Sequence, residues 1–179
     1  EGIIAFDSAG DNHGTLYGEP IWQPAGGKLG GALELAGAFE HVETGFTIDP
    51  GAGPFSVFAW VRGGGPGQAI LSQAGGANWL MAAPAGALMT ELKGAGRTGK
   101  PLISAVSATD GAWHRVGFTW DGTNRTLYMD DIEVARDTQS SLTGSAGDLH
   151  IGAGSALSAG TFWSGLIDDV RIYNRVVTP

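Results

Sequence analysis

The segment GLIDDVRIYNR, Gly165 to Arg175, decides the fold class and raises the first question about function. Its strand-forming residues recur at a period of two, which predicts a β-strand. Val170 and Ile172 are apolar and face the predicted core. Strict alternation then turns Asp168 inward as well and leaves Asp169 outward. A buried carboxylate needs a partner that pairs with it or is coordinated by it, so we expect Asp168 to mark a special site.

Short strand-like segments recur along the rest of the sequence, separated by Gly, Pro, Asn, Asp or Ser. No long stretch keeps a 3.6-residue period, so we expect little helix. Turns at Asp121–Asn124 and at Asp130–Asp131 should join three consecutive strands. About a dozen short strands predict an all-β fold, a jelly-roll β-sandwich of two antiparallel sheets. We expect residues 1–179 to form a single domain, a module of a larger protein.

The composition excludes several functional classes. The 179 residues carry a net charge of −8 and no basic run, which argues against a nucleic-acid groove or an anionic membrane surface. No apolar run is long enough to cross a membrane. There is no cysteine, which excludes disulfides and thiolate metal sites, although an extracellular bacterial protein can also lack them. The excess of carboxylates leaves room for a hard cation such as calcium.

Several blocks in this order resemble a known family: NHGT, WHRVGFTWDG and GLIDDVRIYNR. They are similar to laminin G-like domains of the concanavalin A-like lectin/glucanase superfamily, and closest to the bacterial group found as modules in large extracellular proteins. The resemblance covers nearly the whole chain. It implies a jelly-roll sandwich, a frequent structural calcium and roles in glycan binding, protein binding or adhesion, without indicating one ligand. The family usually has Gly where Asp131 stands, and Asp can still adopt a left-handed turn.

The resemblance also implies a metal site for Asp168. In related members the Asp of the matching motif ligates calcium together with groups near the start of the chain. The counterpart here is FDSAGDNHGT, where Asp7, Asp11 and Asn12 lie close together among glycines. Calcium takes six to eight oxygens, which carboxylates and carbonyls of a bent loop can supply. The alternative is that Asp168 accepts hydrogen bonds from backbone amides and that Asp7 only starts a turn.

Catalytic motifs are missing from the sequence. Glycosidases need two carboxylates on either side of one bond, and the related glucanases carry an ExDxxE-like motif that this chain lacks. There is no GxSxG motif for serine chemistry and no HExxH or HxxxH spacing for zinc. The glycine-rich KGAGRTGK segment lacks the Walker spacing. We therefore expect no enzymatic activity.

Aromatic side chains near loops are the candidates for ligand binding. Trp22, Trp79 and Trp163 sit beside glycine-rich segments, where an indole face can stack on a sugar ring. The alternative is that these three tryptophans cover the edges of the sandwich.

These observations predict a non-catalytic, calcium-binding module of an extracellular or cell-surface bacterial protein, with carbohydrate as the ligand. We expect the isolated module to be monomeric, with no nucleic-acid partner and no insertion into a membrane. Two alternatives stay open: a structural or protein-adhesion domain without a glycan site, and an accessory domain of a glycoside hydrolase.

Overall fold

The structure is a computed structural model that describes residues 2–94 and 99–179. These residues form β-strands and connecting loops in two antiparallel sheets, and none of them lies in a helix that could span a membrane. In spatial order, the eight-stranded sheet contains β1 (Ile4–Ala5), β2 (Gly14–Tyr17), β5 (His41–Thr44), β14 (Leu149–Ile151), β7 (Ala69–Gln73), β8 (Asn78–Ala82), β9 (Ala87–Thr90) and β10 (Leu102–Ser107). The seven-stranded sheet contains β13 (Ile132–Thr138), β12 (Asn124–Met129), β11 (Trp113–Trp120), β6 (Phe55–Gly63), β15 (Ser164–Tyr173), β4 (Ala32–Ala36) and β3 (Ile21–Gln23).

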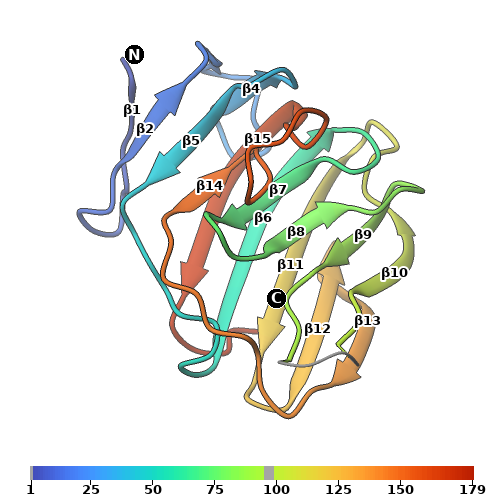
Figure 1. Cartoon of the computed structure of the whole chain (residues 1–179). Helices are drawn as coiled ribbons and strands as arrows, with labels where there is room; N and C mark the ends of the chain where they lie inside the picture. Colours follow the sequence, from blue (N-terminus) through green and yellow to red (C-terminus); the bar gives the residue numbers. More distant parts are fainter. Residues whose placement is uncertain (1, 95–98) are drawn as a thin grey trace.

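The two sheets lie face to face, with β5, β14, β7 and β8 crossing over β15, β6 and β11 (Figure 1). Aromatic side chains of both sheets meet in the core between them. The ring centroid of Phe55 lies 5.0 Å from that of Trp79 in the opposite sheet and 5.5 Å from that of Phe118. This packing confirms the predicted jelly-roll sandwich with one shared core.

The predicted run of three strands is also confirmed. β12 follows β11 after the turn that begins at Asp121, and Met129 pairs with Ile132 across a two-residue turn. Asp130 and Asp131 have φ angles of 52° and 67°, as a hairpin turn of the primed type requires at both central positions. Asp131 therefore adopts the left-handed conformation in place of the glycine that is usual in the family.

A β-bulge in β15 overturns the predicted orientation of Asp168. Asp168 pairs with Trp60, whereas Arg171 pairs with Phe58, so β15 contains one residue more than β6 over this interval. The backbone absorbs that residue at Asp169, whose φ is 48°. Before the bulge Ile167 packs in the core, and after it Val170 does so.

Alternation therefore starts anew within the strand, and the side chain of Asp168 lies on the outer face of the sheet. The expectation that Asp168 points into the core is wrong. It assumed an unbroken period of two, which the sequence pattern alone cannot test.

Candidate functional site

Two of the three predicted ligand-binding tryptophans are core residues. The side chains of Trp79 and Trp163 are 0% exposed. The Trp163 ring packs so closely on Gly64 that a Cβ added there would lie 2.3 Å from it. A sugar cannot reach either indole, so the prediction that Trp79 and Trp163 bind ligand is wrong, and both stabilise the sandwich instead.

Trp22 is the accessible member of this trio. It lies on β3, an edge strand, and its partly buried ring lines a cleft of about 690 Å³ whose other walls are Gly2, Ile3, Ile4 and Phe6. Phe6 is 77% exposed and Ile3 is 71% exposed. Apart from the indole N–H of Trp22, the lining side chains of this cleft are apolar, so they offer few groups that could fix the hydroxyls of a sugar. A ligand role for Trp22 stays a prediction.

The predicted N-terminal metal ligands form a self-contained turn. Asp7 Oδ1 accepts a hydrogen bond from the Ala9 amide at 2.8 Å, and Asp7 Oδ2 accepts one from the Asn12 amide at 3.2 Å. The Ala9 hydrogen bond contributes most to lowering the pKa of Asp7, and bonds from Asn12 lower it further. Both carboxylate oxygens are therefore already engaged by the turn, as in the alternative in which Asp7 merely starts it.

Asp168 is engaged elsewhere. Its Oδ2 accepts a hydrogen bond from the amide of Leu29 at 2.8 Å and thereby holds the loop between β3 and β4 against the outer face of the seven-stranded sheet. A Cβ on Gly27 would lie 2.7 Å from the same oxygen, so the loop needs glycine at this position. Lys28 of this loop covers the ring of Trp60, the pairing partner of Asp168, at 5.1 Å.

The four predicted calcium ligands do not fit one site. Asp7, Asp11 and Asn12 follow β1 of one sheet, whereas Asp168 lies on the outer face of the other. Within residues 2–94 and 99–179 no three His, Asp or Glu side chains are grouped so that they could hold a metal ion. Calcium binding stays a prediction from the family resemblance alone.

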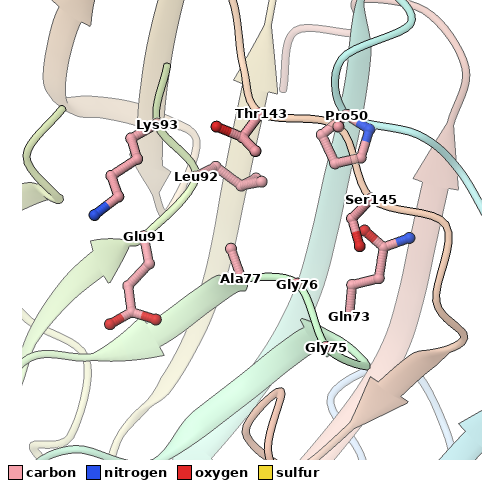
Figure 2. Close-up of a pocket in the computed structure, with 11 residues that line it drawn as sticks. Pro50, Gln73, Gly75, Gly76, Ala77, Glu91, Leu92, Lys93, Thr143 and Ser145 are labelled. Carbon is pink, nitrogen blue, oxygen red and sulfur yellow. The ribbon is translucent and has the colours of Figure 1, made fainter. Parts of the chain in front are cut away.

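A pocket that contains several polar side chains lies where four segments of the chain meet (Figure 2). Its volume is about 230 Å³. The β7–β8 turn, the segment after β9, the segment before β14 and the loop between β5 and β6 all contribute. The lining residues are Pro50, Gln73, Gly75, Gly76, Ala77, Glu91, Leu92, Lys93, Thr143, Gly144 and Ser145.

Gln73 gives the pocket an unpaired acceptor. It is the last residue of β7 and is 0% exposed. Its Nε2 donates to the carbonyl oxygens of Ile48 at 3.0 Å and Gly147 at 2.9 Å, which fixes the orientation of the amide. Its Oε1 is buried and has no hydrogen-bond partner among the described residues. A buried acceptor is costly to leave unpaired, so a hydroxyl group that reaches Gln73 Oε1 would gain a hydrogen bond there.

The other polar side chains are spread around the pocket wall. Gln73 and Ser145 lie on one side of the pocket and Glu91 and Lys93 on the other, with Thr143 between them (Figure 2). The charged ends of Glu91 and Lys93 are turned away from Gln73. Gln73 is the most deeply buried of these side chains, whereas Lys93 and Thr143 are exposed. The Glu91 carboxylate is fixed by a 2.7 Å hydrogen bond from Asn78 Nδ2.

Hydrogen bonds hold the walls of the pocket in place. The Thr143 amide donates to the Lys93 carbonyl at 2.8 Å, which joins two of the loops. The Ser145 amide donates to Asp49 Oδ1 at 3.1 Å, which joins a third. The Leu92 carbonyl accepts a hydrogen bond from the buried guanidinium of Arg125. Because these bonds are made within the chain, the pocket is largely formed before any ligand arrives.

No sequence pattern indicated this pocket. Its residues come from four separate segments, and no motif connects them. The one local signal is the glycine pair in QAGGAN, residues 73–78, which indicates a turn without specifying a ligand. Among the described lining residues Glu91 is the one carboxylate, so the pocket lacks the pair that glycoside hydrolysis requires.

Comparisons with solved structures find the same fold in several binding proteins. Domain 4 of AbnA, a GH43 extracellular arabinanase from Geobacillus stearothermophilus solved in complex with arabinotriose, matches with a TM-score of 0.66 and 19% identity over 96% of this chain and 87% of that one. The binding domain of Paraclostridial Mosquitocidal Protein 1 matches with a TM-score of 0.74 and 10% identity over 98% of this chain and 48% of that one. The botulinum neurotoxin serotype G binding domain matches with a TM-score of 0.71 and 16% identity, over 96% and 45% of the two chains. The chain thus spans about half the length of the two toxin domains.

The sequence itself matches a family. No curated protein matches the chain. Residues 36–179 match the family model of the concanavalin A-like lectin/glucanases superfamily, which confirms the resemblance seen in the sequence blocks. That match covers most of the chain, and the two-sheet sandwich agrees with it. The chain belongs to the concanavalin A-like lectin/glucanase superfamily.

Proposed function

We propose that this chain is a non-catalytic carbohydrate-binding module of an extracellular bacterial protein, and that the pocket of Figure 2 receives the sugar. The observation that carries the proposal is the buried Oε1 of Gln73, which has no hydrogen-bond partner among the described residues, in a pocket that also offers hydroxyl groups and one carboxylate. A sugar presents several hydroxyl groups in a fixed arrangement, and each can donate to one oxygen while accepting from another group.

The comparisons support this proposal through the fold they share. One similar structure is a domain of an extracellular glycoside hydrolase with arabinotriose bound, and two others are the binding domains of toxins. The first of these also favours a specific version of the function, in which the chain is an accessory domain that holds a hydrolase on its polysaccharide. The single carboxylate of the pocket supports a binding role without catalysis.

A screen of immobilised glycans tests the proposal. The wild-type chain should give reproducible binding to a subset of sugars. Glu91→Ala and Ser145→Ala should each weaken it at least several-fold, because each removes a hydrogen-bonding group from the pocket. Lys100→Ala and Ser140→Ala serve as matched controls outside the lining residues and should bind like the wild type.

Two results would contradict the proposal. If no glycan binds the wild-type chain, with or without added calcium, the structural or protein-adhesion alternative replaces it. If the purified chain releases reducing sugar from a bound polysaccharide and Glu91→Gln stops the release, the module is catalytic.

A further inference from the structure

We infer that the pocket recognises the terminal unit of a glycan, by hydrogen bonds to its hydroxyl groups, and not a run of consecutive sugars along a chain. This inference rests on the proposed function and specifies how the same pocket binds. It separates two kinds of carbohydrate site: a pocket that takes a chain end, and an open groove that takes the middle of a chain.

The size of the pocket limits what can enter. Its volume of about 230 Å³ lies below the range of roughly 300–1,000 Å³ that is typical of sites for larger ligands. Loops from four segments surround this space, and Gly76 and Gly144 in its wall leave no room for a side chain. A Cβ on Gly76 would lie only 2.6 Å from Ser145 Oγ. One sugar ring fits such a space, whereas several consecutive rings do not.

The chemistry of the lining residues excludes recognition by stacking. The described lining residues contain no aromatic side chain, and residues 95–98, which lie outside the described ranges, contain none in the sequence. Sites that follow a polysaccharide chain rely on aromatic faces because every sugar ring offers a stacking surface. A site built from an amide, two hydroxyl groups and two charged side chains depends instead on the number and position of the ligand's free hydroxyls.

A chain end satisfies that dependence better than an internal unit. Gln73 Oε1 is buried and has no donor among the described residues, while both N–H groups of the same amide already donate to the carbonyl oxygens of Ile48 and Gly147. An internal sugar unit carries fewer free hydroxyl groups, because glycosidic bonds occupy a position on both of its sides. A terminal sugar has a bond on one side only. It can therefore present its free side to Gln73, while the rest of the glycan leaves past the exposed residues Lys93 and Thr143.

Binding measurements with matched sugar series test this inference. The probes are arabinose, arabinotriose and linear arabinan, together with corresponding series built on xylose, galactose and glucose. In a series that binds, we expect the monosaccharide to retain an affinity within about tenfold of the trisaccharide and to block binding of the polymer. When the polymer is partly cleaved, the number of protein molecules bound per unit mass of polymer should rise in proportion to the number of chain ends.

A matched pair of variants ties the result to the pocket. Gly76→Ala should lower the affinity for monosaccharide and trisaccharide equally, by at least tenfold, because its methyl group enters the space at Ser145. Gly45→Ala, where an added Cβ meets nothing within 4 Å, should change neither affinity. Thermal melting of both variants would show whether each is folded.

The outcomes separate this inference from the proposed function. Affinity that rises more than a hundredfold from one sugar to three, or polymer binding that ignores chain ends, would overturn recognition of a terminal unit while leaving carbohydrate binding intact. If Trp22→Ala abolishes sugar binding and Gly76→Ala does not, the sugar binds in the apolar cleft at Trp22 and not in the pocket. If none of the series binds and Gln73 meets only ordered water, the inference and the proposed function fall together.

Discussion

The guanidinium of Arg125 and the carboxylate of Asp137 form a two-point ion pair beside the sandwich core, with Nε 2.8 Å from Oδ1 and Nη2 bonded to Oδ2. The Arg125 side chain is completely buried, and its Nη1 donates to the Leu92 carbonyl in the pocket wall. One pair therefore connects β12 and β13 to the segment that lines the pocket.

Breaking this pair should cost considerable stability. Asp137→Asn leaves the Arg125 charge buried without its partner, which should lower the free energy of unfolding by about 3 kcal/mol in a urea titration. The control is Arg136→Met, because the Arg136 side chain is 49% exposed and its charged contacts are 3.6 Å and 3.9 Å long. That change should cost less than about 1 kcal/mol. Equal effects of the two changes would show that the buried pair has no special role.

Asp168→Ala tests the corrected role of Asp168. Removing the carboxylate leaves the Leu29 amide without its acceptor, which should lower the free energy of unfolding by about 1 kcal/mol. If Asp168 only holds the loop, this loss is the same with and without a chelator. If Asp168 binds calcium, the outcome differs: chelator lowers the melting temperature of the wild type by several degrees and leaves that of Asp168→Ala unchanged.

The packing of Gly64 on Trp163 provides a steric test. Gly64 has a φ of 76° and no space for a Cβ, whereas Gly67 has a φ of 82° and nothing within 4 Å of the added atom. Gly67→Ala should cost about 1 kcal/mol from backbone strain alone. Gly64→Ala adds the displacement of a buried indole and should cost roughly 3 kcal/mol. Similar losses in chemical denaturation would mean that Trp163 moves aside at little cost.

His114 should stabilise the domain below neutral pH. Burial opposes its charge, but hydrogen bonds to Asp130 at 2.8 Å and Asp110 at 3.0 Å outweigh burial and raise its pKa above the ordinary value of 6.5. A raised pKa gives stability that is fully present below pH 6.5 and is lost as the pH rises through the folded-state pKa. The free energy of unfolding of His114→Gln should therefore fall furthest below that of the wild type at pH 5, in urea titrations repeated between pH 5 and pH 8.

His150 should have the opposite effect. Burial on the outer face of the eight-stranded sheet lowers its pKa below 6.5, and the nearby Gly154 carbonyl only partly compensates. The unfolded chain then binds the proton more readily, so this residue removes stability as the pH falls below 6.5. His150→Gln should flatten that acid-side loss in the same titrations. If both histidine variants shift the pH profile in one direction, the assigned pKa directions are wrong.

Local sequence patterns were enough to specify the fold and the family. Alternation in FSVFAWVR and HRVGFTW, turn residues at Asp121–Asn124 and Asp130–Asp131, and the lack of helical periodicity predict strands, hairpins and a sandwich. These features are local, because a strand pattern or a turn is specified by neighbouring residues. The structure confirms β11, β12 and β13 in the predicted order.

Which residues face a ligand depended on tertiary contacts. The bulge at Asp169 reverses the face of Asp168, and it depends on pairing between β15 and β6. The burial of Trp79 and Trp163 depends on side chains from distant strands. The pocket at Gln73 brings together four segments that are far apart in the sequence. Each of these features follows from contacts between distant parts of the chain, which a local pattern does not specify.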